Sequence, residues 1–211
     1  MSTAELFRIV MALLGTGALL TMLVVIVRRL NAARERALQE LAARLGLEYT
    51  PGGRDFFQGS WPGKVTGSYR GHSLSLHYRN EPSMTRQAYK RANYSAMIEM
   101  AVKNPQQASI SLSARPFSAA GDPFERRVEV TSKPGAFAGG VLADASLRSR
   151  LMAALTRDRL NPGRINLARS GTLVYTRGGI LRSSADLAAL VELLGDLADG
   201  IEAQPERNSE R

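Results

Sequence analysis

Apolar residues follow two different patterns in this chain, and the change falls near residue 28. Residues 9–27 are 19 consecutive positions without a charge. A helix of that length rises about 28 Å, close to the hydrocarbon thickness of a bilayer. After it, apolar and polar residues alternate in short periods, as they do in a globular domain. The pattern predicts a transmembrane helix over residues 9–27, preceded by a short lead over residues 1–8.

Basic residues flank the apolar run unequally. No small-residue cleavage pattern precedes Arg28 and Arg29, so an uncleaved anchor is favoured over a signal peptide. The lead carries only Arg8, whereas five arginines follow the run: Arg28, Arg29, Arg34, Arg36 and Arg44. By the positive-inside rule we expect a single-pass protein of the plasma (inner) membrane, with its N-terminus outside and its C-terminal domain in the cytoplasm.

Residues 28–46 have the pattern of a basic juxtamembrane helix. Leucines recur on one of its faces, at Leu38, Leu41 and Leu45. Gly46 is a natural helix end. Such a helix could lie on anionic lipid or could be a rigid spacer packed against the domain. Glu35 and Glu40 reduce the attraction to lipid, which favours the spacer.

Period-two alternation predicts antiparallel hairpins in the part that follows. The first covers residues 65–78 and turns at Gly71. The second covers residues 94–114 and turns at Asn104 and Pro105. Further short strands are expected near residue 128, at 165–167 and at 173–175.

Two helices are expected near the C-terminus. Asp144 is a good N-cap for a helix that continues to Thr156, and Ser183 or Ser184 caps the last helix. The last helix has the most regular apolar stripe in the chain: Leu187, Leu190, Val191, Leu194, Leu197, Ala198 and Ile201. The predicted fold is one α+β domain over residues 47–203, an antiparallel β-sheet of hairpins packed by two C-terminal helices. A small barrel-like or PH-like arrangement stays open, and residues 204–211 are expected to be a disordered tail.

The residues that usually carry catalysis or bind metals are scarce. The chain has no cysteine and only two histidines, His72 and His77, which are five apart and so point to opposite faces of a strand. It has no phosphate-binding glycine loop, no dinucleotide fingerprint, no nucleophile elbow and no paired-histidine zinc motif. We therefore expect no catalytic residues, no cofactor and no metal, and predict that the protein is not an enzyme.

The formal net charge is +9, and 24 of the 28 basic residues are arginines because the chain has four lysines. Arginine suits phosphate and carboxylate, although a bias toward Ala, Arg and Gly is the simpler explanation of its abundance. A polar stretch over residues 81–93 is long enough to be functional. The candidate contact surface comprises Arg86, Tyr89, Lys90 and Arg91 of this stretch, together with Arg70, Arg79, Arg126 and Arg127.

Two short motifs and the order of elements resemble a family of small single-span bacterial membrane proteins of uncharacterised function. The motifs are Leu45-Gly46-Leu47-Glu48-Tyr49 and Gly67-Ser68-Tyr69-Arg70-Gly71. They follow a membrane span and a basic helix, as in that family. The resemblance implies a bacterial plasma-membrane protein and brings no activity and no site residues with it.

Three functions are compatible with these observations. The favoured hypothesis is a membrane-anchored cytoplasmic module for protein interaction or scaffolding, with another protein as its partner. The alternative is an anion-binding module that uses its arginines to bind anionic lipid head groups or, less favoured, nucleic acid. An enzyme with an unrecognised site is the third.

Overall fold

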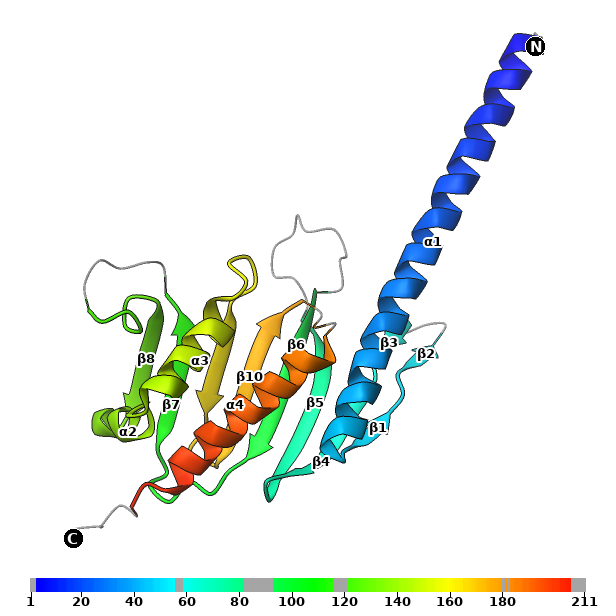
Figure 1. Cartoon of the computed structure of the whole chain (residues 1–211). Helices are drawn as coiled ribbons and strands as arrows, with labels where there is room; N and C mark the ends of the chain where they lie inside the picture. The colour runs from blue at the N-terminus through cyan, green and yellow to red at the C-terminus, as the bar shows by residue number, and fades with distance from the viewer. Residues whose placement is uncertain are drawn as a thin grey trace.

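The structure is a computed structural model that describes residues 3–55, 59–81, 93–115, 121–179, 181 and 183–205. A long N-terminal helix projects from an antiparallel sheet, and further helices pack on one face of that sheet (Figure 1). The strands are β1 (Glu48–Thr50), β2 (Gly53–Asp55), β3 (Gly59–Trp61), β4 (Lys64–Tyr69), β5 (His72–Glu81), β6 (Asn93–Ala101), β7 (Ser109–Ala114), β8 (Val128–Lys133), β9 (Gly163–Leu167) and β10 (Thr172–Gly178).

Eight strands form one sheet in the order β1-β4-β5-β6-β10-β9-β7-β8, and β2 pairs with β3 separately. Neighbouring strands are antiparallel throughout. The predicted α+β class with an antiparallel sheet is confirmed. The first hairpin is also confirmed: β4 and β5 are joined by Arg70 and Gly71, both with positive φ. A turn of that kind matches the twist of paired strands and favours glycine.

The predicted second hairpin is wrong. β6 and β7 are formed as expected, but β10 and β9 lie between them. Each strand has two edges that can pair with another strand, and alternation within a segment does not determine which strand pairs with it. The sheet is open, with β1 and β8 at its two edges, so the barrel-like arrangement is excluded for the described strands.

The long helix α1 (Thr3–Leu45) is continuous from the predicted span into the domain. Its N-terminal half carries large apolar side chains that are mostly exposed, for example Leu19 and Met22. Its C-terminal half buries one face, including Leu38 and Leu41, which are completely inaccessible. The predicted basic helix over residues 28–46 is therefore the second half of one helix, and it packs against the domain.

Three helices lie on the same face of the sheet: α2 (Gly135–Val141), α3 (Ala145–Thr156) and α4 (Ser184–Glu202). The Asp144 carboxylate accepts hydrogen bonds from the first turn of α3, and the Ser183 hydroxyl accepts one from Asp186 N. The seven predicted stripe residues of α4 are all buried. The short helix α2 was not predicted, because its sequence is mostly Gly and Ala and has no apolar period.

The sheet presents alternate residues to the helices. Cross-strand register places one buried row across five strands: Leu76, Ile98, Tyr175, Ile165 and Leu112. The neighbouring row on the opposite face carries shorter and more polar side chains: Ser75, Glu99, Val174, Asn166, Ser111 and Thr131. The core thus lies on the helical side, while the other face is partly exposed.

Candidate functional site

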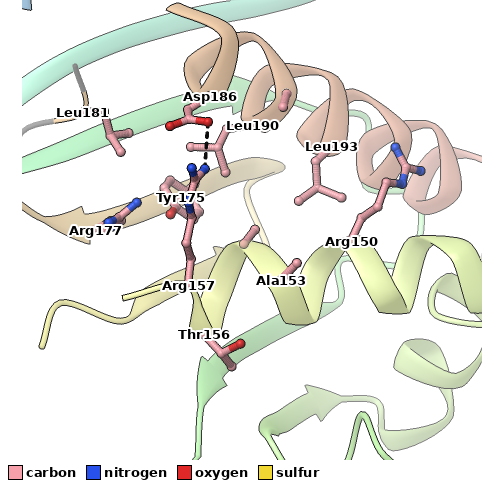
Figure 2. Close-up of a pocket in the computed structure, with 12 residues that line it drawn as sticks. Arg150, Ala153, Thr156, Arg157, Tyr175, Arg177, Leu181, Asp186, Leu190 and Leu193 are labelled. Carbon is pink, nitrogen blue, oxygen red and sulfur yellow. Dashed lines mark ion pairs between the residues drawn. The ribbon is translucent and has the colours of Figure 1, made fainter. Parts of the chain in front are cut away.

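A groove of about 560 Å³ opens between α3 and α4 above strand β10. Figure 2 shows α3 and α4 contributing its two sides and β10 its floor. Its walls are apolar and are formed by Ala153, Ala154, Leu181, Leu190 and Leu193. The volume falls within the range of about 300–1,000 Å³ that is usual for small-molecule sites.

Two polar groups at the floor lack hydrogen-bond partners. Tyr175 is 1% exposed, and its hydroxyl and Nε of Arg177 are both buried without a partner at full hydrogen-bond geometry among the described residues, although the Arg177 side chain lies close to the phenol. Gly163 makes room for the phenol, since a Cβ there would lie 3.0 Å from its hydroxyl oxygen. Burial raises the pKa of Tyr175, while the nearby Arg177 charge works in the opposite direction. The floor therefore holds two buried groups that can donate hydrogen bonds.

Ion pairs surround the groove. Arg157 Nη1 lies 2.7 Å from Asp186 Oδ1 and joins the end of α3 to the first turn of α4, as the dashed line in Figure 2 shows. Arg150 Nη1 lies 2.7 Å from Asp196 Oδ2. Arg177 Nη2 lies 3.3 Å from Asp158 Oδ2. Each arginine that lines the groove thus has one carboxylate partner.

These contacts alter the acidity of the groups. The hydrogen bond that Arg157 donates to the Asp186 carboxylate raises the pKa of Arg157. Burial raises the pKa of Asp196, but bonds from Arg70 and Arg150 outweigh it and hold that pKa below its ordinary value. Arginine and carboxylate are therefore paired one-to-one around the rim.

The groove lies at the end of the domain from which the apolar half of α1 leaves. Glu40 Oε2 accepts a hydrogen bond from the Ser184 hydroxyl at the start of α4, at 2.8 Å, and Arg44 pairs with Glu192 one to two turns later. Helices α1 and α4 therefore run in the same direction. Asp186 is in the first turn of α4, so Arg157, which pairs with it, also lies at the end of α4 where Ser184 is.

Only half of the predicted contact residues are among the residues that the structure describes. Arg86, Tyr89, Lys90 and Arg91 lie outside the described residues. Arg70 Nη1 pairs with Asp196 Oδ1 at 2.7 Å and Asp199 Oδ2 at 3.2 Å. Arg79 is near the other end of β5 from Arg70, about 23 Å away at the usual rise of a strand.

Arg126 and Arg127 precede β8, five strand spacings from β5, or about 24 Å. Arg126 Nε donates to the Gly121 carbonyl, so part of its hydrogen bonding is internal. The four described arginines do not form one patch. The contact role of the remaining four residues stays a prediction.

The two histidines are placed as their spacing predicts. His72 is buried on the helical side of β5, with Nε2 3.4 Å from Asp199 Oδ1 and Nδ1 3.5 Å from Glu202 Oε1. His77 lies on the opposite face beside Ser75. The described residues contain no group of three or more His, Cys, Asp or Glu that could hold a metal ion.

Sequence comparison finds no matching family model and no matching curated protein. A solved structure with the same fold is the mycobacterial trehalose monomycolate transport factor A, TtfA. Its TM-score is 0.53 at 11% sequence identity, and the alignment covers 83% of this chain and 98% of TtfA. At that identity the likeness shows a shared fold.

The groove residues were not among the predicted contact residues. Tyr175 was predicted only as a strand residue, and Arg157 and Arg177 were not singled out. One signal was available in the sequence: Leu173, Tyr175 and Arg177 share one face of a period-two strand. An arginine on an inward face is unusual and marks a buried polar position.

Proposed function

We propose that this protein is a membrane-anchored accessory module that holds a protein partner at the cytoplasmic surface of the bilayer. The observation that carries the proposal is that one continuous helix contains both the predicted apolar span and residues of the domain core. A domain joined in this way presents a constant face to whatever lies beside it in the membrane.

The anchor's N-terminal half is suited to lipid. One helix among the described residues is long and apolar enough to cross a membrane, and its apolar window, of mean hydropathy 1.4, is not buried in the domain. Eight large apolar side chains of this half are 42–70% exposed: Met11, Leu19, Leu20, Met22, Leu23, Val24, Val25 and Ile26. A continuous apolar surface of that kind is unfavourable in water and favourable in a bilayer.

The junction between the predicted span and the domain contains buried and partly buried polar groups that contact one another. Arg34 is 3% exposed, and its guanidinium lies 5.9 Å from the centre of the Tyr78 ring and 3.2 Å from Glu35 Oε1. Glu35 also accepts hydrogen bonds from the Tyr49 hydroxyl and from Gly63 N. These contacts join α1 to three separate parts of the domain, which supports a fixed orientation.

The likeness to TtfA supports an accessory role. TtfA is a transport factor by name and has the same fold over most of this chain. We propose by this likeness that the protein partner belongs to a membrane transport system. The partly exposed face of the sheet, with Ser111, Asn166 and Val174 in one row, is the surface that we assign to the partner.

Alanine insertions after Ala32 test the fixed orientation. Ala32 is exposed and precedes the buried part of α1. Five alanines turn the domain by about 140° relative to the span and raise it about 7.5 Å, whereas seven turn it by about −20° and raise it about 10.5 Å. A photocross-linker at Ser111 in the full-length protein, irradiated in native membranes, reports contact with the partner.

We expect the parent and the seven-residue insertion to give the same protein adduct, and the five-residue insertion to lose most of it. Equal adducts from all three proteins would contradict the fixed orientation. A parent protein that gives no protein adduct from Ser111 would contradict the assigned face. A matched cross-linker at Ala153 in the groove distinguishes a partner that binds the helical side.

A further inference from the structure

We propose that one edge of the domain rests on the bilayer that holds the predicted span and binds the head groups of anionic phospholipids there. This span-side edge comprises Arg115, Arg127, Arg159 and Leu160. Its three arginines bind lipid phosphates, and Leu160 enters the boundary between head groups and acyl chains. The inference goes beyond partner binding and rests on one part of the proposed function, the use of α1 as a membrane span.

The register of the sheet gives the level of this edge relative to α1. Tyr78 on β5, Arg177 on β10 and Gly163 on β9 lie in one row across the sheet. The Arg34 guanidinium of α1 lies 5.9 Å from the centre of the Tyr78 ring, so Arg34 belongs to the same level. Arg34 comes seven positions after the predicted span ends, at residue 27. The row is therefore about 10 Å from the end of the span along the helix.

The span-side edge lies beyond that row, toward the membrane. Arg159 and Leu160 are in the α3–β9 loop, which immediately precedes Gly163. Arg115 follows the last residue of β7 and Arg127 precedes the first residue of β8, at the same end of the sheet. In Figure 1 the yellow α3–β9 loop lies at the end of the sheet toward which α1 leaves. Head groups add about 5–7 Å to each side of the hydrocarbon core, and spans tilt by about 20° on average, so this edge is within their reach.

The three arginines of the edge have no carboxylate partner in the described part of the chain. They line a hollow of about 530 Å³ together with Thr156 and Pro162. Their guanidinium groups form no ion pair and no hydrogen bond with any described residue, whereas each arginine of the α3–α4 groove is paired. An external anion can therefore bind them without displacing a carboxylate of the protein.

Arg115 and Arg127 are neighbours across two strands. Arg115 N donates to the Arg127 carbonyl at 2.8 Å, one position beyond the Ala114–Val128 pair. Both side chains are exposed. Like charges at opposite positions of paired strands repel each other. A phosphate that accepts from both guanidinium groups removes this repulsion and adds charge-assisted hydrogen bonds.

The loop that carries Leu160 is held in shape by Asp158. Oδ1 of Asp158 accepts hydrogen bonds from Leu160 N at 2.9 Å and from Asn161 N at 3.3 Å, and Oδ2 accepts one from Arg177. Asp158 thus bonds within the loop and to β10. Leu160 is 90% exposed and is the most exposed large apolar side chain outside α1 among the described residues. An apolar tip beside unpaired arginines has the combination by which amphipathic segments bind anionic bilayers.

Charge and position together favour lipid over a soluble anion. Each arginine close to an anionic bilayer strengthens binding about fivefold, so three strengthen it about a hundredfold. The bilayer that holds the span supplies anionic head groups at high local concentration. None of the described residues that line the hollow is aromatic, so it lacks the platforms on which single-stranded nucleic acid stacks.

Quenching by spin-labelled lipid tests the proposal. The chain has no cysteine, so Asn161→Cys, at an exposed position next to Leu160, takes one NBD fluorophore in the full-length protein. The labelled protein is placed in nanodiscs of phosphatidylcholine, with or without phosphatidylglycerol, that contain lipid with a nitroxide head group. We expect strong quenching with phosphatidylglycerol. In phosphatidylcholine alone the ratio of docked to undocked protein should be about a hundredfold lower.

A matched pair of triple variants isolates the three arginines. Arg115→Gln, Arg127→Gln and Arg159→Gln combined should lower the docked ratio about a hundredfold in discs with phosphatidylglycerol. The control removes three charges from exposed residues at the opposite end of the sheet and should leave the ratio unchanged: Lys103→Gln, Lys133→Gln and Arg169→Gln.

Leu160→Ser isolates the apolar tip. It should lower the docked ratio about fivefold in both kinds of disc, because it removes apolar surface and leaves the charge unchanged. The Leu160 side chain is exposed, so the substitution should leave the melting temperature of the protein unchanged. An unchanged docked ratio would exclude insertion of Leu160.

The other outcomes separate this proposal from the proposed function. A chain that does not stay in the discs would contradict the membrane span, and with it the edge. A chain that stays in the discs and is quenched with neither lipid composition would overturn the edge alone, since the edge would not touch the bilayer. Equal quenching in both lipid compositions would exclude selection of anionic lipid. Equal losses in the two triple variants would exclude the three arginines as the site.

Discussion

Helix α4 packs against α1, α2 and α3, and its contacts with α1 and α3 differ in how completely they are filled. On the α1 side, Leu38 and Leu41 are inaccessible, and the buried Arg34 has Glu35 and the Tyr78 ring beside it, although its Nε is unpartnered among the described residues. Toward α3, a groove of about 560 Å³ remains above Tyr175, whose hydroxyl is unpartnered among the described residues. The contact with α1 is closely packed, whereas the contact with α3 leaves space beside the sheet.

The largest difference between the two contacts should appear on removal of a leucine. Leu41→Ala leaves a cavity in the contact with α1, and we expect the free energy of unfolding to fall by about 2–5 kcal/mol. Leu193→Ala removes a side chain that already borders space and should lower it by roughly half as much. Denaturant unfolding of the full-length protein in micelles, followed by Trp61 fluorescence, measures both. Equal losses would mean that the groove is as tightly packed as the α1 contact.

The polar junction of α1 should give the next largest effect. Glu35→Gln removes the charge that faces buried Arg34 and weakens the bonds from Tyr49 and Gly63. We expect a loss of about 1–3 kcal/mol in the same unfolding experiment, because Glu35 is only partly buried. Glu48→Gln, exposed on β1, is the control and should change little. If Glu35→Gln left the free energy of unfolding unchanged, the contact with the Tyr78 ring would be sufficient to stabilise Arg34.

Acid should weaken both contacts. Burial raises the pKa of Glu35, but bonds from Tyr49, Gly63 and Arg34 outweigh it and hold that pKa below its ordinary value. The pKa of Asp196 is likewise held below its ordinary value by bonds from Arg70 and Arg150. Because the folded pKa values are lower than the unfolded ones, their stabilisation is present above about pH 4.5 and is lost as pH falls through the folded values. Unfolding curves between pH 6 and pH 3 should show this loss. A smaller loss in Glu35→Gln would assign part of it to α1, and an identical loss would exclude Glu35.

The smallest effect separates two tyrosines. The Tyr78 hydroxyl donates to the Leu181 carbonyl at 2.9 Å, whereas the Tyr175 hydroxyl has no partner among the described residues. Tyr78→Phe should lower the free energy of unfolding by about 1 kcal/mol, and Tyr175→Phe should leave it unchanged or raise it slightly. Thermal unfolding of the protein compares them. A loss in Tyr175→Phe equal to that in Tyr78→Phe would show that its hydroxyl is bonded.

Much of the secondary structure was predictable because its causes are local. The turn at Gly71, the cap at Asp144 and the stripe from Leu187 to Ile201 each depend on residues within a few positions of one another. The incorrectly predicted second hairpin shows the limit of prediction from local causes. Residues 94–114 contain two good strands, but β6 pairs with β10, which begins more than 70 residues later. Alternation identifies a strand and its inward face, but it does not identify its neighbour.

The candidate site was less predictable than the fold. The sequence pointed to exposed basic residues, and the four described ones lie at separate ends of the sheet, one of them, Arg70, held by Asp196 and Asp199. The groove instead joins Arg157, Tyr175 and Arg177 to α4. Of these residues only Arg177, an arginine on the inward face of a strand, is unusual in its own segment. Their importance comes from the space between two helices that pack on the same strands.

The sequence by itself determined the long apolar helix, the α+β class, most strands and the helix caps, because hydrophobic period, turn residues and capping act over one to four residues. Only the tertiary structure decided the order of the strands, the packing of α1 against β4 and α4, and the groove above Tyr175. Those features depend on which distant surfaces bury each other best. That comparison of free energies involves the whole chain, so no single segment contains it.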